Sequence, residues 1–175
     1  MLKTILLAGV AVVALLLAYA ATRPDTFRVE RSATVKAAPE RIFALINDLH
    51  LFNTWNPYEK KDTAIKGEYT GNASGPGAAY AWQSNKVGVG QMEIVDASSP
   101  ERITMKLDFV KPFEAHNVAE FMLKPQGGAT EVTWSMHGPV PYVSKLIGVF
   151  FNMDRMIGKD FEDGLGNLKN IAEAG

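Results

Sequence analysis

The sequence has no cysteine among its 175 residues and no surplus of either charge. The missing cysteine excludes disulfides, thiolate nucleophiles, cysteine-ligated metals and lipidated cysteines. The 18 basic residues are balanced by 19 acidic ones, which gives a formal net charge of −1. A nucleic-acid-binding protein normally shows a basic surplus, so we expect no nucleic-acid partner.

Signatures of metal sites and of nucleophilic catalysis are also missing. The three histidines, His50, His116 and His137, are scattered without the spacing of metal ligands. Ser135 and Ser144 lack the G-x-S-x-G context of a nucleophile. The glycine-rich stretch "GVGQ" lacks the lysine and the helix of a phosphate-binding loop. We therefore predict neither a metal nor a cofactor.

One long hydrophobic run lies at the N-terminus. No side chain from 5 to 21 is charged, and the run is followed by a polar break with a proline at 22–24. Its length is at the short end of what a membrane-spanning helix needs, and Tyr19 suits a membrane interface. The triplet Ala18-Tyr19-Ala20 also fits the cleavage site of a signal peptide. We favour an anchor, because the apolar run continues through that site.

This run divides the chain into residues 1–22, an N-terminal anchor or signal peptide, and residues 23–175, a single domain. As an anchor, the run predicts a single-pass membrane protein; if it is cleaved, the domain is periplasmic or secreted. Three arginines follow the run and one lysine precedes it, which mildly opposes export. Folded domains often translocate regardless, so the side of the membrane stays open, as does the oligomeric state.

Most of the domain alternates apolar and polar residues, as β-strands do. In "ITMKLDFVKPF" (103–113), Ile103, Met105, Leu107 and Phe109 share one side. We predict a first strand in 26–37 and six more at 64–70, 78–84, 88–97, 102–110, 114–124 and 130–137. The breaks between the later strands are short and rich in turn residues, which predicts an antiparallel meander.

Helices are expected before and after the meander. The segment 38–49 shows an apolar stripe at helical spacing, and 49–60 is an aromatic turn region. A further helix is expected after Pro141, and 154–174 is a long amphipathic helix. A sheet with one apolar face and a long striped helix bury both surfaces when the sheet curls around the helix.

The sequence resembles a known superfamily in three stretches and in the closing helix. The stretches are "FRVERSATVKAAPERIFALINDLHLFNTWNPY", "KPFEAHNVAEFML" and "TEVTWSMHGP". The sequence is similar to the START-like (SRPBCC) helix-grip superfamily, and within it to the polyketide cyclase/dehydrase and lipid-transport branch. The resemblance implies an α+β fold in which an antiparallel sheet of about seven strands curls around a C-terminal helix. It also implies a ligand cavity between sheet and helix, but no particular reaction.

The alternation predicts which side chains face that cavity. The ligand-binding candidates are Trp55, Tyr69, Tyr80, Trp82, Met92, Met105, Leu107, Phe109, Asn117, Phe121, Trp134, Met136, Met153, Met156, Ile157 and Phe161. The residues expected at its open end are Trp55, Tyr58, Trp82, Phe113, Phe150 and Phe151. Methionines and aromatic rings suit an adaptable apolar pocket, although the same residues also suit a filled core.

Polar residues separate a carrier from an enzyme. On the predicted strand, Asn117 faces inward and His116 faces outward, where Glu120 is its expected partner. His137 is expected to point outward or to cap the turn at Gly138. Asp160 lies at the edge of the helix stripe and is either a proton donor or ligand anchor, or a solvated carboxylate paired with Lys159 or Arg155. Two hypotheses remain.

The first hypothesis is a membrane-associated protein that binds or transfers a hydrophobic small molecule, such as a lipid or a polyketide-like compound. The alternative is a cyclase/dehydrase-type enzyme that acts on a bound carbonyl compound through His116 or Asp160. No catalytic constellation is evident in the sequence, so the residues favour a binding protein. A hydrophobic small molecule and a membrane are the expected partners.

Overall fold

A single antiparallel sheet of seven strands forms the body of the protein, in the order β1-β7-β6-β5-β4-β3-β2. The computed structural model describes residues 2–175. The strands are β1 Thr26–Val35, β2 Lys66–Gly71, β3 Ala78–Ser84, β4 Gly88–Ser98, β5 Arg102–Lys111, β6 Ala115–Gln126 and β7 Ala129–Pro139. Strands β2 to β7 form the predicted meander, and β1 pairs with β7 at the far edge.

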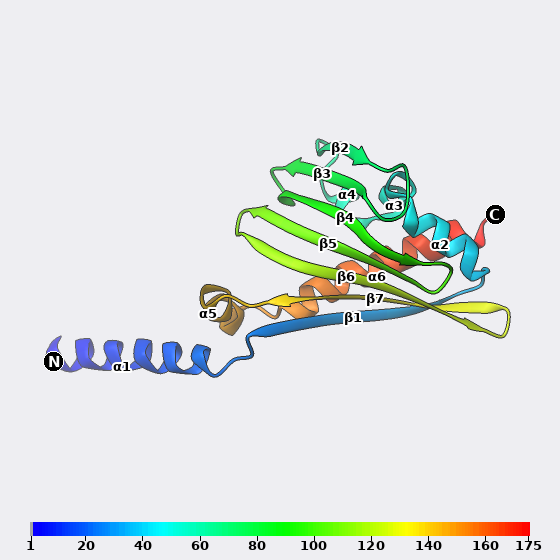
Figure 1. Cartoon of the computed structure of the whole chain (residues 1–175). Coiled ribbons are helices and arrows are strands. Elements are labelled where there is room, and N and C mark those ends of the chain that lie inside the picture. The colour runs from blue at the N-terminus through cyan, green and yellow to red at the C-terminus, as the bar shows by residue number, and fades with distance from the viewer. Residues whose placement is uncertain (1) are drawn as a thin grey trace.

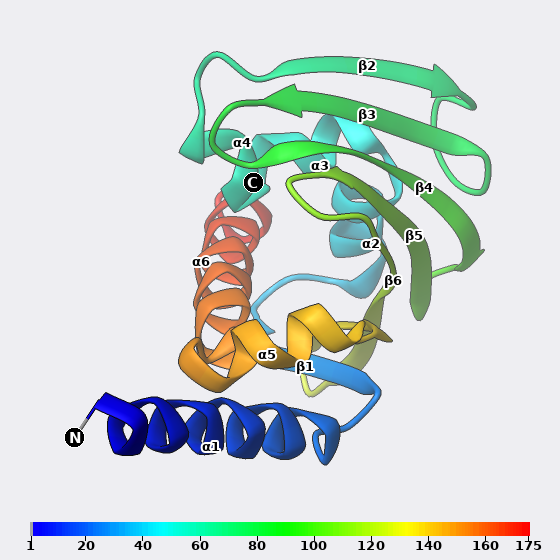
Figure 2. The ribbon, with the colours of Figure 1, turned by 90° about the vertical axis from the view of Figure 1, so that its left-hand side faces the viewer.

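Six helices accompany the sheet in the part of the chain that the structure describes. They are α1 Leu2–Ala21, α2 Pro39–Asn47, α3 Leu49–Trp55, α4 Pro57–Lys61, α5 Tyr142–Phe150 and α6 Met153–Glu173. Helix α6 lies along the concave side of the curled sheet (Figures 1 and 2). This arrangement confirms the predicted helix-grip fold.

The predicted turn region at 49–60 is instead two short helices, α3 and α4. The side chain of Asp48 accepts hydrogen bonds from the backbone of His50 and Leu51 and begins α3. Asn56 accepts a hydrogen bond from the backbone of Tyr58, and Pro57 occupies the first turn of α4. These caps satisfy backbone donors that a short helix cannot pair by itself.

One end of the concave face is a filled core. Side chains of α2, α3 and the second half of α6 pack there against the sheet. The fully buried ones include Ile42, Ile46, Trp55 and Leu168 from the helices and Ile94 and Ile103 from the sheet. Trp55 donates its indole N–H to the carbonyl of Leu45 at 2.8 Å. Asn167 of α6 donates to the Trp55 carbonyl at 3.1 Å, which ties α6 to α3.

A polar clamp holds the first half of α6 to β1. Arg31, on the inward side of β1, reaches Asp154 and Glu162, with nitrogen–oxygen distances of 3.0 Å to each carboxylate. Its guanidinium crosses α6 at Gly158, where a Cβ atom would lie 2.0 Å from the Arg31 nitrogen. The arginine that interrupts the apolar pattern of the first strand is therefore a contact between sheet and helix.

Helix α1 projects away from the domain (Figure 1). Over residues 2–175 it is the one helix long and apolar enough to cross a membrane, with a mean hydropathy of 2.5 and 6% of its span buried. Near its end, the Tyr142 hydroxyl of α5 donates to the Leu17 carbonyl at 2.8 Å. A membrane anchor and a signal sequence share these properties, so the anchor remains a prediction.

Candidate ligand cavity

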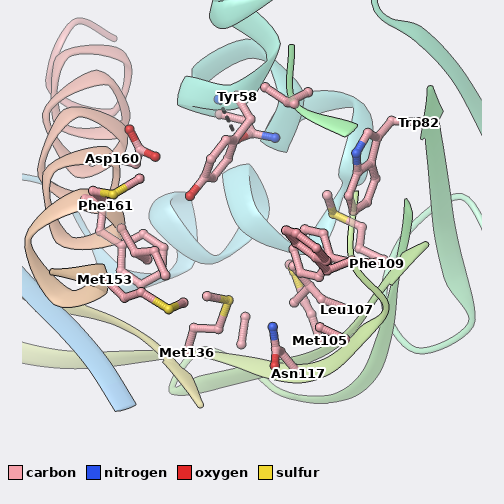
Figure 3. Close-up of a pocket in the computed structure, with 18 of the residues that line it drawn as sticks. Tyr58, Trp82, Met105, Leu107, Phe109, Asn117, Met136, Met153, Asp160 and Phe161 are labelled. Carbon is pink, nitrogen blue, oxygen red and sulfur yellow. Dashed lines mark hydrogen bonds between the residues drawn. The ribbon is translucent and has the colours of Figure 1, made fainter. Parts of the chain in front are cut away.

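A cavity of about 520 Å³ lies between the sheet and the first half of α6. Strands β3 to β7 supply one wall, α6 supplies another, and α3 and α4 border it (Figure 3). Lys86, Lys111, Phe113 and Met156 line it and are themselves exposed, so they mark its mouth. The β5–β6 turn, which contains Phe113, is at the end of the sheet near α5 (Figure 1), so the mouth is at that end.

The walls are mostly apolar and easily reshaped. Five methionines line the cavity, namely Met92, Met105, Met136, Met153 and Met156. Methionine is unbranched and polarisable, so it adapts to irregular or varied ligands. Between the sheet and α6, Trp134 of β7 stacks on Phe161 of α6, with ring centroids 4.0 Å apart. A wall of this kind favours hydrophobic molecules and imposes little fixed shape.

Strand β5 supplies residues to both the core and the cavity. Ile103 is fully buried in the core, whereas Met105, Leu107 and Phe109 line the cavity. Phe109 packs edge-on against Trp82, with centroids 5.7 Å apart. The Trp82 ring lies over Gly90 of the next strand, where a Cβ atom would be 2.6 Å from the indole. No local sequence pattern marks Gly90, because its role depends on a neighbouring strand.

Asn117 is the buried amide of the cavity wall. Its residue exposure is 7%, and its Oδ1 atom has no hydrogen-bond partner within residues 2–175. The side chain points into the cavity with its nitrogen foremost (Figure 3). Gly138 is close by on β7, and a Cβ atom there would lie 2.1 Å from Oδ1. The inward orientation predicted for Asn117 agrees with this placement, and the amide can meet a polar group of a ligand.

Two further polar contacts at the cavity involve residues of α4. Lys61 donates to Asp160 at 2.6 Å, and the Tyr80 hydroxyl donates to Glu59 at 2.7 Å. Burial, with the nearby Asp160 carboxylate, raises the pKa of Tyr58. Burial, with the hydrogen bond to Glu59, likewise raises the pKa of Tyr80. Both phenols, already protonated at neutral pH with the ordinary pKa of 10, are held more firmly in that form.

Asp160 does line the cavity, but its expected partners were wrong. Its partner is Lys61, 99 residues away in the sequence, whereas Lys159 pairs with Asp163 one turn further along α6. A contact between α4 and α6 of this range has no signal in the local sequence. The ion pair holds the carboxylate at the edge of the cavity, with 18% of its side chain exposed.

His116 lies on the outer face of the sheet, as predicted, with 62% of its side chain exposed. Its Nδ1 atom is 2.6 Å from Asp108, directly opposite on β5, and not beside the expected Glu120. The hydrogen bonds from Lys106 and His116 lower the pKa of Asp108 to about 2. Asp108 in turn raises the pKa of His116. This pair is separated from the cavity by the sheet.

Several predicted residues lie away from the cavity. Trp55 is fully buried in the core and does not reach the mouth. Tyr69 is 38% exposed on the edge strand β2, where it stacks on His50 with centroids 3.8 Å apart. Phe150 and Phe151 are exposed beside α5 and do not line the wall. The other ligand-binding candidates all line it, as do Tyr58, Trp82 and Phe113 from the mouth set.

The remaining histidine forms no site either. His137 follows the inward-facing Met136 on β7 and lies half-buried on the outer side, as predicted; its Nδ1 atom lacks a hydrogen-bond partner among the described residues. Within residues 2–175, no group of three or more His, Asp or Glu side chains could hold a metal ion.

Sequence reasoning missed Phe52, Val87 and Ile65, which reach the cavity from a helix and from loops.

A family model described as polyketide cyclase / dehydrase and lipid transport matches residues 26–173. The chain belongs to this family. The matched region covers the whole sheet and all of α6, so it contains the cavity just described. Membership in the polyketide cyclase/dehydrase and lipid transport family indicates that the protein binds a hydrophobic ligand.

Solved structures share the fold at low sequence identity. A protein from Chromobacterium violaceum is 15% identical, with a TM-score of 0.60 over 87% of this chain and 100% of that one. Major latex-like protein 151 from Panax ginseng is 12% identical, with a TM-score of 0.61 over 85% and 99%. DynU16, encoded in the dynemicin biosynthetic locus, is 14% identical, with a TM-score of 0.60 over 87% and 49%. No curated protein matches the sequence significantly.

Proposed function

We propose that this protein binds a hydrophobic small molecule in the cavity between the sheet and α6 and exchanges it with the membrane that anchors it. The observation that carries the proposal is the cavity of about 520 Å³ with a wall of methionines and aromatic rings. Pockets for small molecules typically span ~300–1,000 Å³. Burial of the ligand's apolar surface supplies the affinity, at ~25 cal/mol per Å².

The Asn117 amide adds selectivity to this apolar wall. The Asn117 nitrogen leads into the cavity while its oxygen faces Gly138, so a ligand with a hydroxyl or carbonyl oxygen gains by accepting a hydrogen bond from this amide N–H. We expect the preferred ligand to carry one such group, as a fatty acid, a sterol or a polyketide does. In Asn117→Leu, binding of such a ligand weakens, while binding of a purely hydrocarbon probe is kept.

The proposal is tested by native mass spectrometry of the full chain in lipid nanodiscs, followed by solvent extraction and analysis of co-purified molecules. A bound lipid or aromatic compound supports the proposal and names the ligand class. Uptake of a hydrophobic fluorescent probe should fall in Trp82→Ala and Phe109→Ala, which remove cavity wall. Met105→Leu is the matched control, because it keeps the volume of the wall. A ligand-free chain that takes up no probe contradicts the proposal.

A second candidate function is proton transfer to a bound carbonyl compound, as in a cyclase or dehydrase. It rests on Asp160, which lines the cavity beside Tyr58. His116 is on the outer face and cannot reach a ligand in the cavity. The enzyme is favoured if the chain converts an extracted ligand and this conversion stops in Asp160→Asn. His116→Ala is the control and should leave the conversion unchanged. Binding without conversion favours the carrier.

A further inference from the structure

We infer that the mouth of the cavity docks directly onto an anionic lipid surface, with α5 and the β5–β6 turn lying at the headgroup level. This inference rests on the proposed function, because it assumes that α1 stays in the membrane. Four features of the described residues carry it: the contact between α1 and α5, the exposed apolar side chains around the mouth, the lysines there, and the direction of the mouth.

The contact between α1 and α5 fixes the depth of α5. Tyr142 begins α5 and donates to the carbonyl of Leu17, four residues before the end of α1. At 1.5 Å per residue, Leu17 lies roughly 6 Å inside that end. Tyr19 and Arg23, whose side chains meet at 3.3 Å, are the aromatic and basic residues that mark a membrane–water boundary. Helices that lie in the interface are buried by ~5–10 Å, which matches this position of α5.

The outer face of α5 is apolar and uncharged. Val143, Ile147 and Phe150 follow one another at helical spacing and are 60%, 36% and 72% exposed. The one charged side chain of α5, Lys145, is turned inward and pairs with Asp25, which ties α5 to the segment that follows α1. A charge-free face of this kind is costly in water and is stable at the boundary between headgroups and acyl chains.

The other side of the mouth carries matching residues. Phe113, at the tip of the β5–β6 turn, is 62% exposed, and Met156 on α6 is 61% exposed. Lys86 and Lys111 are exposed beside them and line the cavity. Hydrogen bonds from Ser84 and Ala64, together with the nearby Lys86 charge, lower the pKa of Asp62. Apolar tips with exposed lysines fit an anionic bilayer, where each lysine contributes through the surface potential.

The direction of the mouth agrees with these residues. Helix α1 extends from the end of the domain that carries α5 and the β5–β6 turn, while the β6–β7 turn is at the opposite end (Figure 1). A bilayer crossed by α1 therefore meets the mouth and not the filled core. A ligand then passes between lipid and cavity without crossing water, which is the step that a carrier of hydrophobic molecules needs.

The test uses the absence of cysteine, which allows one label per chain. Phe113→Cys, Phe150→Cys and, as the control at the far end, Gln126→Cys are labelled with an environment-sensitive fluorophore in the full chain. The chains are placed in nanodiscs of phosphatidylcholine and phosphatidylglycerol that contain lipids with a shallow nitroxide quencher. We expect several-fold stronger quenching at 113 and 150 than at 126. Equal, water-like signals at all three positions overturn the inference.

Charge variants test the lipid class. Lys86→Gln and Lys111→Gln should each lower the ratio of docked to undocked mouth by roughly five-fold in anionic nanodiscs. Lys124→Gln, an exposed lysine far from the mouth, is the matched control. If the labels at 113 and 150 are buried by a second chain and are not quenched by the nitroxide lipids, the mouth self-associates and the inference is overturned. Probe uptake by the same chains in detergent separates docking on the lipid surface from ligand binding in the cavity. If the probe is taken up but the mouth does not dock, the docking proposal alone is overturned. If the probe is not taken up, the proposed function is overturned.

Discussion

In the first half of β5, Ile103 is fully buried beneath α2, whereas Leu107 and Phe109 in the second half are partly buried and border empty space. The alternation along the strand is the same in both halves. The difference comes from the helices that face the strand. Helices α2 and α3 fill one end of the concave face, whereas at the other end the cavity separates the first half of α6 from the sheet. A curled sheet thus supplies an apolar face, and the helices decide whether it becomes core or pocket.

The largest expected effect contrasts two leucines on neighbouring strands. Leu123 is 2% exposed in the filled core, and Leu107 lines the cavity. Leu123→Ala should lower the free energy of unfolding by about 2–5 kcal/mol, because it leaves a void that the core cannot close. Leu107→Ala should cost at most ~1 kcal/mol, because its side chain already borders a space.

Urea unfolding of the full chain in mild detergent, followed by tryptophan fluorescence, measures both leucine variants. Probe uptake should change in the opposite order, with the larger change in Leu107→Ala. Similar unfolding costs for the two variants would falsify the division of the sheet into core and pocket.

The next effect comes from adding volume. Ala119 lines the cavity between Met105 and Met136 in the strand register, whereas Ala78 is buried away from it. Ala78→Leu should destabilise the protein by about 1–3 kcal/mol through overpacking. Ala119→Leu should leave stability nearly unchanged and reduce probe uptake, because the added carbons occupy the cavity. A large destabilisation by Ala119→Leu argues that the space is already filled.

Sequence alone predicted the sheet and the orientation of Asn117 and His116, because these follow from residue alternation, and it predicted the closing helix from an apolar stripe at helical spacing. It placed Trp55 at the mouth, whereas the capped helix α3 carries this residue into the core. It also missed the Lys61 partner of Asp160 and the contact of Arg31 over Gly158, which join distant segments. Alternation shows which face is apolar, but the volume left opposite that face depends on how all helices pack.

A smaller effect concerns the Arg31 clamp, which holds the cavity half of α6 where the core half is held by apolar packing. Arg31→Ala should destabilise the chain only slightly, since both ion pairs are partly exposed. Gly158→Ala should destabilise the native chain by displacing the guanidinium. In the Arg31→Ala background the same change should stabilise the chain by up to ~1 kcal/mol, because alanine is the better helix former.

A double-mutant cycle on urea unfolding measures this reversal for Arg31 and Gly158. Additive effects of the two substitutions would show that the clamp does not position α6. In that case the separation of α6 from the sheet, and with it the cavity, would depend on apolar packing alone.

The smallest effect is expected from the outer face, where Asp108 raises the pKa of His116 above its ordinary value of 6.5. A raised pKa in the folded chain means that the protonated pair favours folding below the unfolded pKa, and that this contribution is lost as pH rises through the folded one. Asp108 acts in the opposite sense: its contribution is present above its ordinary pKa of 3.8 and is lost as pH falls toward about 2. An NMR titration of the His116 ring should show the raised pKa, and the pKa should fall in Asp108→Asn.

Ligand binding should not follow this titration. The sheet separates His116 from the cavity, so probe uptake in His116→Gln should match that of the native chain across the pH range in which the imidazole loses its proton. Asn117, the next residue on β6, faces the cavity, and Asn117→Leu should alter the choice of ligand at every pH. Adjacent residues on one strand then give a direct comparison of its two faces. A probe affinity that tracks the His116 titration would place the imidazole in contact with the ligand and would restore His116 as a catalytic candidate.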